Sequence, residues 1–287
     1  MHITRFWAAG RERFGVVEQD HYCDLSGSLR DYTELAALCA AGKTDDIAAA
    51  VSSAPRFPHN DVTRLVPLVG NYRVFCAALN YRDHVQEVGL DVPSQPLFFF
   101  KLPESMIDPD SPIPTPRITQ FLDYEAELGV VIGRSGRDIP EARALDHVLG
   151  YCVVNEVSAR DLQVRKDGPR PVVDWFSGKA LDGVAPIGPW IVTRDSVSDA
   201  GDLGVQAWVN GERVQNSRTS QLIFSIPRMI SYISQRVMLR PFDVIATGTP
   251  SGVGHARGRA LQPGDVGKIS VQRIGELSNR VVAPASA

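Results

Sequence analysis

The sequence predicts a protein that is mainly β with some α (the α+β class), built on a closed, mixed or mainly antiparallel β core. From Tyr72 onward, short runs rich in β-branched and aromatic residues are punctuated by glycine and proline. Only two helical patterns interrupt these runs, around 140–149 and 222–235. The pair Asn210-Gly211 between apolar flanks is a strong hairpin signal. Many short strands joined by turn residues favour this core over a parallel doubly wound sheet.

Residues 1–66 differ in pattern and are expected to form a small N-terminal α/β domain, followed by a main domain over 67–287. The first 24 residues suggest short strands with turns at Gly10 and Gly15. Residues 29–51 have helical spacing and are rich in alanine, with a break at Gly42. Residues 52–70 contain three prolines and are expected to form the linker into the main domain.

The main-domain strands are expected where apolar runs end in glycine or proline, because those residues terminate or bend a strand. The expected strands are YRVFCAALN (72–80), PLFFFK (96–101), YEAELGVVIG (124–133), GYCVVNEV (150–157), GPWIVT (188–193), GVQAWVNGERV (204–214), DVIATGTP (243–250) and GKISVQRIG (267–275).

Composition excludes several classes of function. With 287 residues, of which 44% are hydrophobic and 22% charged, the chain is typical of globular proteins. Its net charge of −3 provides no strong electrostatic attraction for nucleic acid or an anionic membrane. It contains no apolar run of 18 residues and no signal-peptide h-region near Met1. Its four cysteines are widely spaced, without a CxxC pair, so we expect reduced thiols in a cytoplasmic protein.

One strand carries a row of acids. In FLDYEAELGVVIG (121–133), Asp123, Glu125 and Glu127 alternate with apolar residues and so share one face of the strand. Two carboxylates 4–5 Å apart repel by roughly 4 kcal/mol at an effective dielectric constant near 20. Solvent exposure, proton uptake or a bound cation can relieve this repulsion. An exposed face with free carboxylates and a metal site both remain open at this point.

A second candidate cluster is LNYRDHVQEVG (79–89). His84 and Glu87 are three residues apart, so they share a face of a helical turn. A carboxylate beside a histidine can orient the ring and form a pair that activates water. A surface His–Glu pair without function is the alternative. The chain has no GxSxG elbow, Walker A loop or HExxH helix.

Three further segments carry polar residues beside apolar strands. GYCVVNEVSARDLQ (150–163) contains Glu156, followed by Arg160 and Gln163. WFSGKALDGVAPIGPW (175–190) contains Lys179 between small residues. DVIATGTPSGVG (243–254) ends a strand in a Gly/Thr turn, whose N–H groups and Thr249 hydroxyl could hold a carboxylate.

Together these segments resemble the fumarylacetoacetate hydrolase family. The resemblance runs from about Arg73 to Asn279 and rests on NYRDH, DYEAELGVVIG, GYCVVNEVSARDLQ, GKALD, PIGPW, VNGERVQNS and DVIATGTPSGVG, in that order. It implies a mixed β-sandwich roll of the family's C-terminal type, and residues 1–66 resemble the small variable domain of many members.

The resemblance also implies site residues. Carried over by position, the ligands of a Mg²⁺ or Mn²⁺ ion would be Glu125, Glu127 and Glu156. The water-activating pair would be His84 and Glu87, and Lys179 would polarise the substrate. The positions expected to bind substrate are Arg82, Arg160, Gln163 and Thr249. Asp123 has no ligand role in the motif and is expected at the exposed edge of the strand.

Three residues depart from the family pattern. Glu156 stands where members usually have Asp, which adds one methylene to a ligand. Ala78 and Phe242 replace usual glycines, and Phe242 suggests a different turn.

The implied function is the hydrolysis of a C–C bond in a 2,4-diketo acid, such as an acylpyruvate, through a metal-bound enolate. The alternatives are a decarboxylase, dehydratase or isomerase of a 2-keto acid on the same metal site. A degenerate member that binds a keto acid without turnover is a further alternative. The implied partners are a small keto acid and a second copy in a homodimer, with no nucleic acid or membrane.

Overall fold

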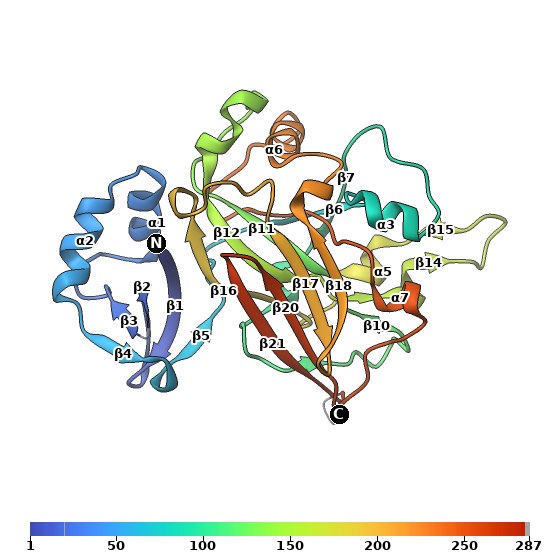
Figure 1. Ribbon diagram of the computed structural model, residues 1–287, viewed down its shortest axis with the longest axis horizontal. Coiled ribbons are helices and arrows are strands. Elements are labelled where there is room, and N and C mark those ends of the chain that lie inside the picture. The colour runs from blue at the N-terminus through green and yellow to red at the C-terminus, as the bar shows by residue number, and fades with distance from the viewer. Residues whose placement is uncertain (20, 285–287) are drawn as a thin grey trace.

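The computed structural model describes residues 1–19 and 21–284, and two β-sheets form its body (Figure 1). The larger sheet has twelve strands, in the order β4 (Arg56–Pro58), β3 (His21–Asp24), β2 (Arg11–Glu18), β1 (His2–Ala8), β16 (Ala185–Thr193), β12 (Val148–Asn155), β11 (Ala126–Ile132), β19 (Val244–Ala246), β6 (Val74–Ala78) and β7 (Leu97–Lys101), with β5 (Thr63–Leu65) on β1 and β8 (Met106–Ile107) on β16. The smaller sheet is ordered β18 (Glu212–Arg218), β17 (Gly204–Val209), β20 (Val266–Val271), β21 (Gly275–Val282) and β9 (Ile113–Pro114).

Short strand pairs and helices surround the two sheets. The pairs are β10 (Leu122–Asp123) with β13 (Ser158–Ala159), and β14 (Val164–Arg165) with β15 (Val172–Val173). The α-helices are α1 (Tyr32–Ala40), α2 (Thr44–Ser53), α3 (Arg82–Glu87), α4 (Arg160–Gln163), α5 (Trp175–Lys179), α6 (Ile226–Ser234) and α7 (Gly254–Arg257). The 3₁₀ turns are η1 (His59–Asp61), η2 (Pro103–Ser105), η3 (Glu141–His147), η4 (Arg194–Ser196) and η5 (Thr219–Gln221).

The predicted α+β class with a mixed, mainly antiparallel core is confirmed. Each expected main-domain run contains a strand, and most neighbours pair antiparallel, with β6–β19 among the parallel exceptions. Asn210 and Gly211 both take positive φ (52° and 84°), as the predicted two-residue hairpin between β17 and β18 requires. The large sheet runs from edge strand β4 to edge strand β7, so it is open rather than closed. Of the two predicted helices, the second is α6, whereas the first is the 3₁₀ turn η3 leading into β12.

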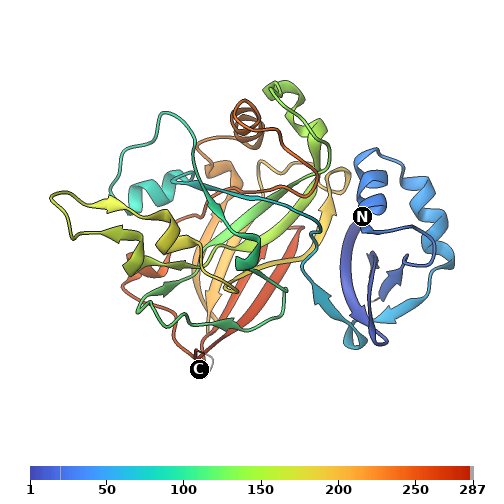
Figure 2. The same cartoon turned by 180° about the vertical axis from the view of Figure 1, so that it is seen from behind.

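The N-terminal strands extend the main sheet. The helical region divides into α1 and α2 at Gly42 (φ 71°), and a turn lies at Gly10 (φ 78°), as predicted. Gly15 instead lies inside β2, and the expected linker contributes β4 and β5. Because β1 pairs with β16, the N-terminal region is joined to the body through the sheet, and Figure 2 shows its helices beside β1.

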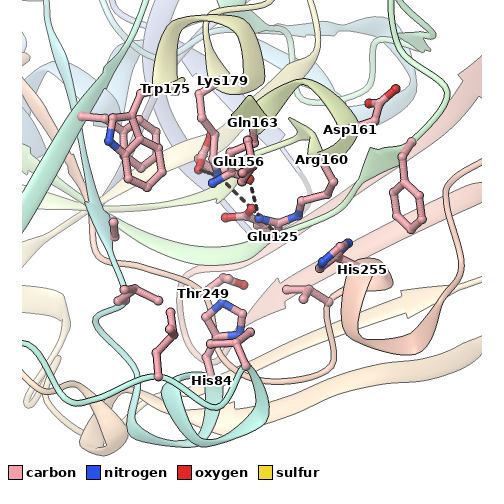
Figure 3. Close-up of a pocket in the computed structure, with 18 of the residues that line it drawn as sticks. His84, Glu125, Glu156, Arg160, Asp161, Gln163, Trp175, Lys179, Thr249 and His255 are labelled. Atoms are coloured by element: carbon pink, nitrogen blue, oxygen red, sulfur yellow. Dashed lines mark hydrogen bonds and ion pairs between the residues drawn. The ribbon is translucent and has the colours of Figure 1, made fainter. Parts of the chain in front are cut away.

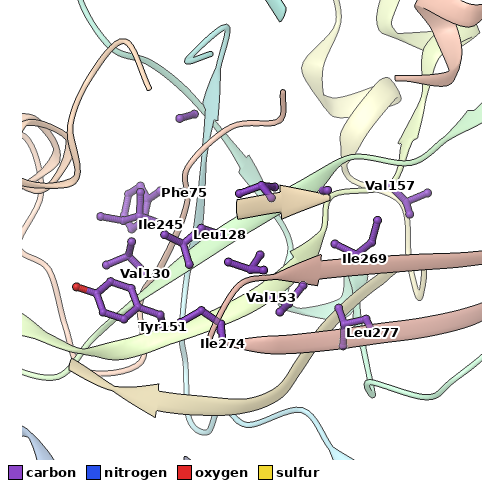
Figure 4. Packing of buried hydrophobic residues seen from close by; sticks show 14 of the residues in the cluster. Phe75, Leu128, Val130, Tyr151, Val153, Val157, Ile245, Ile269, Ile274 and Leu277 are labelled. Carbon is purple, nitrogen blue, oxygen red and sulfur yellow. The ribbon is translucent and has the colours of Figure 1, made fainter. Parts of the chain in front are cut away.

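The main core lies between the two sheets. Figure 4 shows Leu128 and Val130 of β11 and Val153 of β12 facing Ile269 and Leu277 of the smaller sheet. The opposite face of β11 is also covered, because Val131 packs in a second cluster with Leu35 of α1. Burial on both faces explains why β11 reads as a continuous apolar run, and it leaves any polar side chain on this strand away from bulk water.

Phe242 stands where the family resemblance leads us to expect glycine. Its φ of +67° is the left-handed conformation that glycine adopts without a steric penalty. Its ring stacks on Tyr32 of α1 with a centroid distance of 5.7 Å. The substitution therefore adds an aromatic contact between the N-terminal helices and the sheet.

None of the helices within residues 1–19 and 21–284 is long and apolar enough to cross a membrane. Cys23, Cys39, Cys76 and Cys152 are all free thiols, as expected.

Candidate active site

Three glutamates converge where β11 begins and β12 ends. One carboxylate oxygen from each of Glu125, Glu127 and Glu156 lies within 4.8 Å of the others, and all three side chains are buried. Backbone pairing brings them together: Glu156 N donates to Glu125 O (2.9 Å), and Glu125 N donates to the Asn155 side chain (3.1 Å). The predicted meeting of acids from two strands is therefore present, and their exposure to solvent is excluded.

The alternation predicted for the acidic strand is also present. Tyr124, Ala126 and Leu128 pack in the core between the sheets, so Glu125 and Glu127 point to the other face. Gly248 contacts Glu127 on this face. Its N–H donates to Glu127 Oε2 (2.8 Å), its φ is +97°, and a Cβ there would lie 3.0 Å from Asn80 Cβ. This position requires glycine.

Asp123 is not at an exposed edge, and that expectation is wrong. Its side chain is fully buried and accepts hydrogen bonds from Gly254 N (2.7 Å), His255 N (3.0 Å) and Arg160 Nε (2.8 Å). The strand is interrupted after β10, which directs this carboxylate to α4 and to the start of α7. Asp123 therefore fixes neighbouring elements of the site.

Buried cations neutralise two of the three glutamates. Lys179 Nζ lies 2.8 Å from Glu125 Oε1 and 2.6 Å from Glu156 Oε2. Arg160 Nη2 is 2.6 Å from Glu125 Oε1. Lys101, at the end of β7, lies 2.9 Å from Glu156 Oε1 and donates to Val157 O and Lys179 O (2.8 and 2.5 Å).

Among residues 1–19 and 21–284, Glu127 has no cationic side chain within ion-pair distance. Four buried carboxylates (Asp123, Glu125, Glu127 and Glu156) face the three cations Arg160, Lys179 and Lys101, so one negative charge is uncompensated. Burial and then the charges of Glu156 and Glu125 raise the pKa of Glu127 well above its ordinary value. Burial alone would raise the pKa of Glu125, but Arg160 and Lys179 hold it below its ordinary value. A bound dication would supply the positive charge needed to compensate Glu127.

The donor set fits a hard divalent ion. All three side chains offer carboxylate oxygens, which Mg²⁺ and Mn²⁺ prefer. One oxygen of each glutamate lies within 4.8 Å of the other two, so side-chain adjustments could bring all three to one ion. Glu125, Glu127 and Glu156 could therefore hold it.

His84 and Glu87 form the expected pair on α3. His84 Nδ1 lies 3.1 Å from Glu87 Oε2, and Glu87 Oε1 accepts from Gly252 N (2.8 Å). His84 lines the cavity, and Figure 3 shows it and the Glu125–Glu156–Lys179 cluster on facing sides. A water molecule between them would have a base on one side and acid-bound cations on the other.

Gln163 and Lys179 are brought to the cavity by close packing of α4 on α5. A Cβ on Gly178 would lie 2.7 Å from Gln163 Cβ, so only glycine allows this approach. Gln163 accepts from Arg160 Nη1 (3.1 Å). Thr249 also lines the cavity, and Gln215 Nε2 donates to its hydroxyl oxygen (2.9 Å).

Of the predicted site residues, Glu87 and Glu127 are outside the cavity lining formed by residues 1–19 and 21–284 but adjoin lining residues, Glu87 through His84 and Glu127 beside Glu125 and Glu156, whereas Arg82 bonds elsewhere. Its Nη1 donates to Leu222 O (3.0 Å), and Arg82 is absent from the cavity lining formed by residues 1–19 and 21–284. Arg160 does line the cavity, but its guanidinium is engaged by Asp123, Glu125 and Gln163.

The cavity has a volume of about 730 Å³, which is within the range of small-molecule sites. Its floor is polar, with Glu125, Glu156 and Lys179, whereas Leu90, Phe121 and Val253 contribute apolar wall. Trp175 also lines it and stacks on Phe99 with a centroid distance of 4.8 Å. Such a cavity can bind the polar end of a small acid on its floor.

Sequence reasoning missed Lys101 and His255. Lys101 ends the run PLFFFK, where a lysine is ordinarily a surface residue, and no local signal marks it as buried. His255 follows the turn GVG (252–254) and lines the cavity, and only its proximity to the Gly/Thr turn in the sequence could have indicated it.

Comparison with known proteins identifies relatives over most of the chain. Residues 73–282 match the family model described as fumarylacetoacetate (FAA) hydrolase C-terminal. The chain is 41% identical over 225 residues to the mitochondrial oxaloacetate tautomerase fahd2 of Xenopus laevis, covering 78% of this chain and 69% of the relative.

Solved structures are similar over nearly the whole chain. The 5-carboxymethyl-2-hydroxymuconate delta-isomerase of Mycobacterium smegmatis is 33% identical, with a TM-score of 0.79 over 99% of this chain and 100% of that one. The maleylpyruvate hydrolase of Sphingobium sp. SYK-6, in complex with manganese(II) and pyruvate, is 29% identical, with a TM-score of 0.81 over the same shares. This chain belongs to the fumarylacetoacetate hydrolase family.

Proposed function

We propose that this protein hydrolyses the C–C bond between C3 and C4 of a 2,4-diketo acid of the acylpyruvate type, with Mg²⁺ or Mn²⁺ bound. The observation that carries the proposal is the His84–Glu87 pair on the cavity wall facing the glutamate cluster. Tautomerisation needs only proton transfers, whereas hydrolysis needs an activated water, and a carboxylate-supported histidine is suited to that task.

Glu125, Glu127 and Glu156 would hold the ion. When bound, it supplies Lewis-acid stabilisation of negative charge on the keto-acid end of the substrate. Glu87 orients the His84 ring, while Gly252 N–H fixes Glu87 in turn.

In the hydrolytic step, His84 takes a proton from water as the water oxygen bonds to C4. Lys179 stabilises the negative charge that develops in the reaction, because its ammonium is part of the cavity floor. The C3–C4 bond then breaks, and its electron pair remains on C3, which takes up a proton. The products are a carboxylic acid from the acyl part and pyruvate, so all atoms of substrate and water are accounted for.

The relative crystallised with manganese(II) and pyruvate supports both parts of the proposal, since pyruvate is the fragment this reaction releases. The experiment is incubation of the Mg²⁺-loaded protein with acetylpyruvate in H₂¹⁸O, with mass spectrometry of the products. We expect acetate carrying one ¹⁸O and pyruvate. Unchanged substrate mass would contradict hydrolysis.

Tautomerisation of a 2-keto acid is the second candidate, because the Xenopus laevis relative is named as an oxaloacetate tautomerase. The same site would then exchange protons without water attack. Enol-to-keto conversion of oxaloacetate, followed by ultraviolet absorbance, would support this candidate if acetylpyruvate stayed intact.

A further inference from the structure

Asp123 is a fully buried carboxylate that the proposed function does not use. It shares the acidic stretch 123–127 with Glu125, but it is not one of the three glutamates that converge on one point. A charged group is costly to bury unless other groups of the protein contact it. The contacts of Asp123 lead to Arg160, and through Arg160 to the candidate metal ligand Glu125.

Three hydrogen bonds fix the Asp123 carboxylate. Its Oδ1 accepts from Gly254 N (2.7 Å), and its Oδ2 accepts from His255 N (3.0 Å) and from Arg160 Nε (2.8 Å). A Cβ at Gly254 would lie 2.6 Å from Oδ1, so the first contact needs glycine. Because two of the donors are backbone N–H groups, the carboxylate is a fixed acceptor for Arg160.

Backbone pairing places Arg160 beside both acids. β10 and β13 pair antiparallel, with Asp123 opposite Ser158. Arg160 follows β13, and its backbone N donates to Phe121 O (2.9 Å). Ser158 also donates from its hydroxyl to Glu125 Oε1 (2.8 Å). One short strand pair therefore fixes the base of the arginine side chain, and Figure 3 shows the guanidinium reaching Glu125 from there.

The guanidinium of Arg160 is divided between two carboxylates. Nε and Nη2 lie on one edge of a guanidinium, and together they match the two oxygens of a single carboxylate. Arg73 uses them in this way, with Nε on Asp243 Oδ1 and Nη2 on Asp243 Oδ2. At Arg160, Nε instead contacts Asp123, and Nη2 lies 2.6 Å from Glu125 Oε1. Asp123 thus takes the N–H group that would complete a two-point grip on Glu125.

The contacts to Glu125 fall on one of its oxygens. Oε1 accepts from Ser158 Oγ and Lys179 Nζ, each at 2.8 Å. It is also the atom of Glu125 nearest to Arg160 Nη2. These three donors leave Oε2 for a cation. A carboxylate held by both Nε and Nη2 would offer both oxygens to the arginine, so a ligand oxygen stays available only while Arg160 is restrained.

We propose that Asp123 is a positioning residue, which keeps Glu125 available to a divalent cation by holding Arg160 Nε. Without this acceptor, the guanidinium turns both N–H groups onto Glu125 and competes with the ion. The inference rests on the metal site of the proposed function and not on the reaction that follows. It gives a role to the buried acid that lies beside the metal ligands in the sequence.

The test is Mn²⁺ titration, followed by electron paramagnetic resonance, of the wild type, Asp123→Asn, Arg160→Gln and the double variant. We expect Asp123→Asn to lower Mn²⁺ affinity, because the ion must then displace charge-assisted hydrogen bonds between Arg160 and Glu125. The decrease should be at least about tenfold smaller in the Arg160→Gln background, where no guanidinium competes. Loss of the Asp123 charge alone would lower affinity by the same factor in both backgrounds, and that result would overturn the inference.

A second variant moves the Asp123 carboxylate without removing its charge. Gly254→Ala places a Cβ 2.6 Å from Asp123 Oδ1 and so displaces the acceptor of Arg160 Nε. It should lower Mn²⁺ affinity when Arg160 is present and leave it unchanged in the Arg160→Gln background. An equal decrease in both backgrounds would count against the proposed role of Asp123.

Asp243→Asn is the matched control, because Asp243 is also fully buried and paired with an arginine, Arg73. It is not one of the converging glutamates, so its Mn²⁺ affinity should stay within about twofold of the wild-type value. A decrease as large as that of Asp123→Asn would contradict a specific role for Asp123. Absence of Mn²⁺ binding by the wild type would remove the metal site of the proposed function and this inference with it. Equal decreases in the two Arg160 backgrounds would remove this inference alone.

Discussion

Lys101 and Glu156 form an ion pair in which both side chains are almost completely buried, with Nζ and Oε1 2.9 Å apart. Lys101 also donates to the carbonyl oxygens of Val157 and Lys179. Lys101, at the end of β7, thus contacts both the candidate metal ligand Glu156 and the backbone of Lys179. Lys179 in turn contacts Glu156 through its other carboxylate oxygen. The longer Glu156, in place of the family's Asp, is anchored at both oxygens.

This pairing predicts that Lys101→Met destabilises the metal-free protein by about 3–5 kcal/mol, because it removes one of the three buried cations and leaves Glu156 with Lys179, which Glu125 shares, as its only cationic partner among residues 1–19 and 21–284. Adding Glu156→Gln should recover about 2 kcal/mol or more, since the undercompensated charge is removed. Urea unfolding of the single and double variants measures both effects. Lys268→Met, which breaks an exposed pair, should cost at most about 1 kcal/mol. Strictly additive effects of Lys101 and Glu156 changes would contradict the coupling.

The raised pKa of Glu127 predicts that the stability of the metal-free protein depends on pH. The pKa of Glu127 is raised in the folded protein, so between the ordinary glutamate pKa and the raised value the folded state binds more protons than the unfolded state. The free energy of unfolding of the metal-free protein should therefore fall as pH rises through this window. Glu127→Gln should remove the part of this decrease in the free energy of unfolding that Glu127 causes. Saturating Mg²⁺ should turn the decrease into an increase with pH in the wild type but not in Glu127→Gln. Parallel stability–pH curves for the wild type and Glu127→Gln would rule out this origin.

The water-activating pair predicts a kinetic effect. His84→Ala or Glu87→Gln should lower kcat for acylpyruvate hydrolysis by two or more powers of ten, because general base catalysis contributes about that much. Mn²⁺ affinity should stay within about twofold, since neither residue is among the converging glutamates. His21→Ala, at the exposed start of β3, is the control histidine and should keep wild-type kinetics. An unchanged kcat in both site variants would exclude this base.

We expect Gly248→Ala to cause a local defect at the glutamate cluster, and Gly211→Ala is its control. Gly248→Ala and Gly211→Ala both place a side chain at positive φ, which costs about 1 kcal/mol or more of stability. Only at Gly248 would the new Cβ also press on Asn80 and Ala77, next to the N–H that holds Glu127. We expect Mn²⁺ affinity to fall at least tenfold in Gly248→Ala and to stay unchanged in Gly211→Ala, by metal titration. Equal affinities would show that the Gly248 contact does not position Glu127.

Much of the fold follows from local patterns. Period-two spacing separated Glu125 and Glu127 from Tyr124, Ala126 and Leu128, and Asn210-Gly211 marked the hairpin. These signals are local, because side-chain direction in a strand and positive φ at a turn depend on a few neighbouring residues. Gly15 was misjudged for the same reason: its local turn signal is overridden by pairing of β2 with both β1 and β3.

The site could be predicted only in part. The convergence of Glu156 on Glu125 came from resemblance to a family, since nothing local links positions 31 residues apart. Lys101 and Asp123 owe their roles to long-range packing. Lys101 is buried because the ends of β7, β12 and α5 meet, and Asp123 is buried because the start of α7 covers it.

The central claim is that Glu125, Glu127 and Glu156 together hold one divalent cation, and Mn²⁺ titration followed by electron paramagnetic resonance tests it most directly. The signal of free Mn²⁺ should show one saturable site per chain in the wild type and in Glu212→Gln, an exposed acid that is not one of the three converging glutamates. Affinity should fall at least a hundredfold in Glu127→Gln. The absence of a saturable site in the wild type, or equal affinity in Glu127→Gln, would contradict the account.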